Sequence, residues 1–200
     1  NDEFVSDLIR HEDGSIIISG SSNGNFEDID TSSIWTNKKN NGGFDSFVGK
    51  YYLSSTSGVS ESRDGSLEWL DLQGSELNDY GYSLANTNDS GIYLAGVNQN
   101  KSDNIFDGFV RKYNANGSIS WETDLNISGL DNNYLLDIDA NGYKRDHVYV
   151  IGTSTGDFDS QVNHGLTDGI LTKIDVDNGN KEWTRIFGTD DIDIASKVAV

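Results

Sequence analysis

Hydrophobic residues along this chain occur in short runs in which large apolar side chains alternate with small or polar ones. The clearest runs are residues 16–20, 92–96 and 148–152, which are rich in β-branched or aromatic side chains and end in glycine. No eleven-residue window keeps apolar side chains at the i, i+3, i+4 and i+7 positions that an amphipathic helix requires. Short runs between Gly and Asn turn residues are typical of strands, so the pattern predicts an all-β chain.

One strand-like motif occurs three times along the chain. It covers Phe44–Tyr51, Phe106–Tyr113 and Thr167–Ile174. The aspartates at its second position, Asp45, Asp107 and Asp168, lie 62 and 61 residues apart. A motif that recurs at a period of this size indicates a repeat architecture, in which each repeat is one supersecondary unit.

Two further motifs mark the ends of the repeats. An Asx-Gly turn begins five residues before each of Trp69, Trp121 and Trp183, and an aspartate follows each Trp by ten residues. These aspartates are Asp79, Asp131 and Asp193, and Glu3 begins the same pattern. We expect the three Trp side chains to occupy equivalent buried positions on an outer strand and to pack between neighbouring repeats.

The repeats divide the chain into residues 1–78, 79–130, 131–192 and 193–200. Each of the first three units contains four strand signals, and four short antiparallel strands per repeat form one propeller blade. The predicted fold is therefore an all-β β-propeller segment of three four-stranded antiparallel blades plus the first strand of a fourth. We name the strands of a blade A to D from the axis outwards, and expect residues 4–9 and 194–200 to be A strands of two different blades.

The middle unit resembles a known family. Residues 79–84, 91–96 and 106–121 read Asp-Tyr-Gly-Tyr-Ser-Leu, Gly-Ile-Tyr-Leu-Ala-Gly and Phe-Asp-Gly-Phe-Val-Arg-Lys-Tyr-Asn-Ala-Asn-Gly-Ser-Ile-Ser-Trp. In this order they resemble the β-propeller repeat of secreted and cell-surface bacterial proteins, often called the seven-bladed type. The resemblance implies an extracellular or cell-surface location, but it implies no particular activity, because members of the family do different things.

The net charge of the chain limits the classes of molecule that it is expected to bind. Its formal net charge of −19 would repel phosphate backbones and anionic lipid headgroups, which excludes nucleic-acid binding and membrane-surface binding. No apolar run is long enough to insert into a membrane, and no secretion signal opens the chain. Because three blades cannot close a ring and residue 1 is not Met, we expect a segment of a longer protein, completed by its remaining blades or by a partner chain.

Motifs for catalysis and metal binding are weak. The chain has no Cys and only three His, and it has no nucleophile elbow, phosphate loop or zinc-binding His motif, so we expect no enzyme. The alternative is a catalytic propeller of the quinoprotein type, in which the Asn-Gly-x-x-x-Trp turn also occurs as a structural element. No cofactor is expected except possible Ca²⁺ at Asp175 and Asp177, which resemble the start of a calcium loop but also fit a hairpin turn.

The first unit differs from the others by two insertions, a long one between its second and third strands and another at residues 53–62 before the Asp64 turn. Residues 21–43 include Phe26, Trp35, Lys38 and Lys39, an aromatic and cationic cluster on an otherwise acidic chain. The insertion is either a tolerated loop or a binding site for a protein or a glycan. We expect a non-catalytic binding and spacing module in adhesion or matrix interaction; the alternative is a structural shell or filament component that assembles through its repeated blades.

Overall fold

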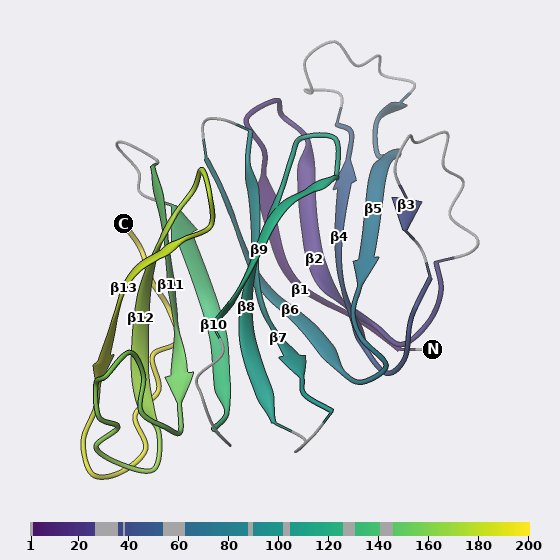
Figure 1. The fold of residues 1–200 in the computed structure, drawn as a ribbon. Coiled ribbons are helices and arrows are strands. Elements are labelled where there is room, and N and C mark those ends of the chain that lie inside the picture. Colours follow the sequence, from purple (N-terminus) through teal and green to yellow (C-terminus); the bar gives the residue numbers. More distant parts are fainter. Residues whose placement is uncertain are drawn as a thin grey trace.

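The computed structural model describes residues 2–26, 36–37, 39–53, 63–87, 90–101, 105–125, 131–140 and 146–200, and these residues are almost wholly β (Figure 1). The first sheet contains β1 (Glu3–Arg10), β2 (Ile16–Ser22), β4 (Asp45–Tyr51), β5 (Leu67–Gln73) and the short β3 (Thr36–Asn37). The second contains β6 (Asp79–Asn86), β7 (Ile92–Gln99), β8 (Phe106–Tyr113) and β9 (Ile119–Leu125). The third contains β10 (Asn133–Ala140), β11 (His147–Ser154), β12 (Asp168–Asp175) and β13 (Lys181–Phe187).

Each sheet repeats the same antiparallel order of A, B, C and D strands, which confirms the predicted fold class. The registers agree in detail, because every A strand carries an irregularity at the same place, after Val5, Gly81 and Leu135. Burial follows the position of each strand: β7 and β8 of the middle sheet are buried over almost their whole length, whereas β1 of the first sheet is mostly exposed. The described residues contain no helix long and apolar enough to cross a membrane.

The three sheets lie side by side and do not close into a ring, so the two ends of the chain lie on opposite sides of the molecule (Figure 1). We call the contact between the first and second sheets the first junction, and that between the second and third the second junction. Apolar clusters fill both. Ile17, Val48, Trp69, Leu84 and Phe109 belong to the first-junction cluster, and the second is built on residues such as Leu125, Leu135, Val150 and Ile170.

A row of aromatic rings crosses both junctions. It runs through Phe4, Phe44, Tyr80, Phe106 and Tyr134, which stand at the starts of A and C strands. Neighbouring ring centroids are 5.5, 5.6, 6.1 and 5.5 Å apart, and their planes are tilted by 30° to 42°. Tilted rings at this spacing contact one another favourably, so the row helps to hold adjacent sheets in place.

The Trp residues occupy equivalent registers, opposite Lys50, Lys112 and Lys173. Trp69 donates its indole N–H to the carbonyl of Ala115 in the next sheet at 3.0 Å, and Trp121 donates in the same way to Val176 at 3.1 Å. Trp69 is buried, whereas Trp121 and Trp183 are half-buried. The predicted packing of each Trp on the following repeat is thus observed at both junctions.

Three details differ from the sequence prediction. The first sheet has a fifth strand, because Thr36–Asn37 of the long insertion pairs in parallel with Leu70 and Asp71 on the outer edge. In the third sheet, Asn133 and not Asp131 aligns with Glu3 of the first sheet and Asp79 of the second. Each of these three residues pairs with a residue of strand B, and that strand B residue also pairs with the motif aspartate of strand C. The connection before β10 is therefore two residues longer than its counterpart before β6.

The third difference concerns residues 193–200, which we expected to be a strand. They are not a strand, because the described residues give them no ladder partner beyond an isolated bridge at Ile192. Yet Val198 donates its backbone N–H to Asp137 Oδ2 at 2.9 Å, as Leu84 donates to Asp7 Oδ2 at 2.7 Å at the first junction. The segment therefore packs on the third sheet as β6 packs on the first.

Candidate binding sites at the blade junctions

The loops that join one sheet to the next fix the geometry of each junction. Asn78 accepts the backbone N–H of Phe44 through its side-chain oxygen at 3.1 Å, and Asn132 accepts that of Phe106 at 3.0 Å. Each connecting loop thus clamps the start of strand C in the preceding sheet. As a result, the start of strand C and the start of the next strand A are adjacent in space although they are far apart in sequence.

This clamp brings two buried carboxylates together at the first junction. Asp45 accepts the backbone N–H of Asn41 at 2.7 Å, and Asp79 accepts that of Ser75 at 2.5 Å, in each case through Oδ2. The Oδ1 atoms of both aspartates are buried without a hydrogen-bond partner. Burial, with a smaller contribution from the charge of Asp79, raises the pKa of Asp45 to about 6. Burial also raises the pKa of Asp79.

Gly74 stands between the two carboxylates and explains why a glycine is needed there. A Cβ on Gly74 would lie 2.4 Å from Asp45 Oδ1 and 2.7 Å from Asp79 Oδ2, closer than non-bonded atoms approach. Gly188 has the same relation to Asp168, whose Oδ1 would lie 2.2 Å from the added Cβ. The motif aspartates therefore support the turns that enter strand C and require a glycine in the loop packed against them.

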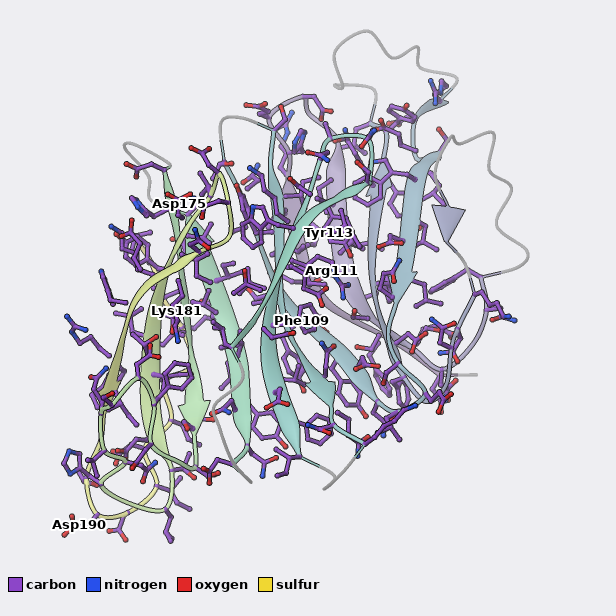
Figure 2. The ribbon with its side chains drawn as sticks, viewed as in Figure 1. Phe109, Arg111, Tyr113, Asp175, Lys181 and Asp190 are labelled. Atoms are coloured by element: carbon purple, nitrogen blue, oxygen red, sulfur yellow. The ribbon has the colours of Figure 1, made fainter. Side chains whose placement is uncertain are left out.

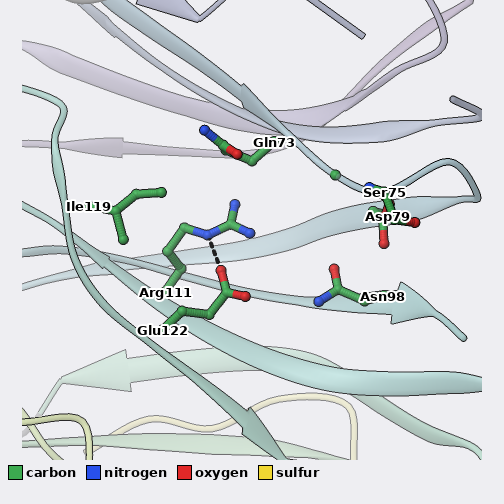
Figure 3. Close-up of a pocket in the computed structure, with 8 residues that line it drawn as sticks. Gln73, Ser75, Asp79, Asn98, Arg111, Ile119 and Glu122 are labelled. Atoms are coloured by element: carbon green, nitrogen blue, oxygen red, sulfur yellow. Dashed lines mark hydrogen bonds and ion pairs between the residues drawn. The ribbon is translucent and has the colours of Figure 1, made fainter. Parts of the chain in front are cut away.

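A pocket of about 260 Å³ opens at the first junction beside Asp79 (Figure 3). Its walls come from the loop after β5 and from all four strands or strand ends of the second sheet. The residues that matter for its chemistry are Ser75, Asp79, Asn98, Arg111, Ile119 and Glu122. Figure 3 shows Asp79 and Asn98 on one side of this space and the paired Arg111 and Glu122 on the other.

Arg111 is the buried cation of this pocket, with 4% of its surface exposed. Its Nε donates to Glu122, and one terminal nitrogen donates to the hydroxyl of Tyr113 at 3.2 Å. In Figure 2, Arg111 and Tyr113 lie together on β8, in the interior of the molecule. Burial raises the pKa of Asp71, partly offset by the Gln73 hydrogen bond and by Arg111, and burial and the Glu122 charge raise the pKa of Asp124.

The predicted loop site is only partly described. Phe26 is half-buried and meets the ring of Phe47 edge-on at 5.4 Å, so it anchors the insertion to the first sheet. Lys39 is exposed. Trp35 and Lys38 lie outside the described residues, so the proximity of the four side chains remains a prediction.

The predicted calcium ligands Asp175 and Asp177 lie at the turn between β12 and β13. Asp175 uses Oδ1 to accept the backbone N–H groups of Asp177 and Asn178, at 2.8 and 3.2 Å, as in an Asx turn. Asp177 is exposed. Asp175 instead lies within ligand distance of His147 and Glu182, whose candidate ligand atoms are all within 4.8 Å of one another. Calcium binding at Asp175 and Asp177 stays a prediction.

His147, Asp175 and Glu182 form a group that sequence reasoning missed. Nε2 of His147 lies 2.8 Å from Glu182, and Nδ1 lies 2.7 Å from Asp146. Lys173 pairs with the second oxygen of Glu182 at 2.7 Å. Strand pairing brings the group together, because His147 lies opposite Asp175. The sequence could have indicated this group through the alignment of strands B, C and D.

A comparison of the chain with protein-family models and with curated proteins finds no match in either set.

Proposed function

We propose that this chain is a segment of a β-propeller of the kind found in secreted and cell-surface bacterial proteins. In this proposal it serves as a non-catalytic binding and spacing module in adhesion or matrix interaction. The observation that carries the proposal is the contrast between a repeated scaffold and the long insertion between the second and third strands of the first unit. The clamps and aromatic contacts recur from junction to junction, whereas the long insertion occurs in the first sheet.

Two features of the described residues support a non-catalytic role. The side chain of His11 is buried, with Nδ1 3.0 Å from Asp13 and Nε2 3.4 Å from the carbonyl of Ser90. Both ring nitrogens of His147 face carboxylates. Each of these imidazoles makes a contact of the scaffold, and neither lines the pocket at the first junction.

The insertion is the part of the first sheet best suited to recognise a partner. Phe26 fixes its beginning against Phe47, and Thr36–Asn37 fixes a later part along the outer edge of β5. Lys39 adds an exposed cation to a strongly acidic molecule. We expect a protein or glycan partner there, because aromatic and cationic side chains are enriched at binding hot spots.

A structural shell or filament is the second candidate, and the exposed apolar face of β1 favours it. Phe4, Val5 and Leu8 are 57%, 64% and 57% exposed, whereas Leu84 and Ile138, which align with Leu8, are almost fully buried. The face of strand A that is covered at both junctions is exposed on β1, so a further blade or another chain would fit against it. A filament protein would form concentration-dependent oligomers in size-exclusion chromatography.

The proposal is tested by the triple variant W35A/K38A/K39A, which leaves Phe26 in place as the anchor. Wild-type and variant chains are compared on a glycan array and on an array of extracellular-matrix proteins. We expect the variant to lose binding and to keep the melting temperature of the wild type. K101A/K181A, which removes two lysines outside the insertion that pair with Glu76 and Asp159, is the charge-matched control. Equal binding by the triple variant and the wild type would exclude the insertion as the recognition site.

A further inference from the structure

The pocket at the first junction contains more negative than positive groups. Arg111 is the cation among its lining residues, and Asp79 and Glu122 are carboxylates. Asp71 lies nearby, with Oδ2 buried and without a hydrogen-bond partner. Glu122 already pairs with Arg111. The charge of that guanidinium is therefore shared: Arg111 lowers the pKa of Asp79, but burial raises it by more.

The burial of Asp79 distinguishes this pocket from an ordinary acidic surface. Asp79 is 1% exposed, it lines the pocket, and its Oδ1 has no hydrogen-bond partner. A buried carboxylate oxygen without a donor is costly, and its cost falls when a cationic donor occupies the space in front of it. Burial raises the pKa of Asp79, and the hydrogen bonds from Ser75 and Gln99 together with the charge of Arg111 offset this only in part.

We propose that the pocket at the first junction binds an alkylammonium group, with the ammonium between Asp79 and Asn98 and its methylene stem against Ile119. Ammonium is the chemistry that fits, because –NH₃⁺ offers three donors to the carboxylate and amide oxygens. Ile119 is 40% exposed and provides an apolar wall for the methylene groups, as aliphatic surfaces do for the stems of lysine side chains.

The dimensions and the charge of the pocket argue against other cations and against anions. A volume of about 260 Å³ holds roughly eight groups the size of a water molecule, which suits a lysine-sized stem and head. A divalent ion would need six to eight oxygen ligands, whereas the carboxylates that line this pocket are Asp79 and Glu122, and Glu122 already pairs with Arg111. An anion would have to displace Glu122 from Arg111 and approach Asp79.

The ammonium could come from a free diamine or from a lysine side chain of a partner protein, and the two sources share the same recognition. The site is distinct from the insertion of the first sheet, so this inference goes beyond the proposed function. Isothermal titration calorimetry with cadaverine and with the peptide acetyl-Gly-Lys-Gly-amide measures both sources on the 200-residue chain. The acetyl-Gly-Nle-Gly-amide peptide, which has a stem but no ammonium, is the ligand control.

The variants separate binding from folding. D79N retains an oxygen that can accept the Ser75 N–H but removes the charge, and we expect at least a tenfold weaker affinity for cadaverine or for the lysine peptide. D193N is the matched control: Asp193 accepts the N–H of Thr189 at 2.6 Å in the equivalent loop and lines no part of this pocket. N98L replaces the amide on the same side of the pocket as Asp79 by an apolar side chain and should also weaken binding tenfold, which keeps the test valid if D79N unfolds.

The outcomes are distinct. Binding of cadaverine supports a free-amine site, and binding of the lysine peptide alone supports a site for a partner side chain; either result supports the proposal if D79N and N98L lose it and D193N keeps it. The proposal is overturned if neither amine binds, if the norleucine peptide binds as well as the lysine peptide, or if D79N binds like the wild type. Calcium or glutamate binding that is lost in D79N would also overturn it.

Discussion

The Asx-Gly turns allow the packing between sheets to be measured with one chemical change at matched positions. Gly65, Gly117 and Gly179 stand at the same place in the turns before β5, β9 and β13, and have φ of 74°, 85° and 75°. An added Cβ on Gly117 would lie 2.6 Å from Cδ2 of Trp69 in the preceding sheet. An added Cβ on Gly65 would have no atom within 4 Å. Replacing Gly65 or Gly117 by alanine therefore introduces the same backbone strain, but only in G117A does the added methyl group clash with Trp69.

The expected magnitudes follow from these contacts. Alanine in the left-handed conformation costs about 1–2 kcal/mol relative to glycine, and this term is common to G65A and G117A. The methyl group of G117A must also displace the indole of Trp69, and overpacking of this kind costs about 1–3 kcal/mol. We expect G117A to be less stable than G65A by about 2 kcal/mol, which corresponds to roughly 4–8 °C in melting temperature for a chain of this size.

Urea unfolding followed by circular dichroism measures the difference in the free energy of unfolding between G65A and G117A. G179A provides a second comparison, since its Cβ would lie 2.7 Å from Cδ2 of Trp121. The reasoning would be refuted if G65A and G117A had the same midpoint and the same m-value. Such a result would mean that the turn does not press on the Trp of the preceding sheet.

Three further outcomes are expected. The pKa of Asp45 is raised to about 6 in the folded state from an ordinary value near 4, so folding takes up a proton between these pH values and the carboxylate lowers stability as the pH rises through 4 to 6. D45N should therefore be more stable than the wild type at pH 7.5 but not at pH 3.5. Parallel curves of melting temperature against pH for the two chains would contradict this. W121F should cost only about 1 kcal/mol, because the carbonyl of Val176 keeps the Lys112 ammonium at 2.9 Å as a donor, and a chemical denaturation loss above about 3 kcal/mol would argue against it. Millimolar calcium should leave the melting temperature unchanged, since the predicted ligands hold a hairpin turn; a chelator-reversible rise would restore the calcium-loop interpretation.

The sequence predicted the fold because the information for it is local and repeated. Each apolar alternation, Asx-Gly turn and motif aspartate defines one strand or turn, and their recurrence fixes the order of strands in a sheet. A constant distance from Trp121 predicts that the A strand of the third sheet begins at Asp131. It begins at Asn133 instead, because this connection is two residues longer. The strand at Thr36–Asn37 was missed because a two-residue parallel pair has no periodic signal.

The candidate pocket could not be predicted in the same way. The aspartates that recur in the sequence stand at the starts of successive repeats and therefore belong to different sheets. The pairs that meet join different positions of different repeats: Asp45 of one strand C lies near Asp79 of the next strand A. Arg111 and Glu122 are neighbours only through the register of β8 and β9. Such contacts depend on the three-dimensional arrangement of the sheets and leave no pattern in a single sequence.

The open arrangement of the three sheets sets an order in which their backbone should become accessible to solvent. In an array whose units contact only their neighbours, stability is a sum of unit and nearest-neighbour terms. The second sheet is covered on both sides, and most of β7 and β8 is buried, whereas β1 and β13 are largely exposed. Amide protons of β7 and β8 should therefore exchange with deuterium only through global unfolding, while those at the two outer faces exchange through partial openings that leave the middle sheet intact.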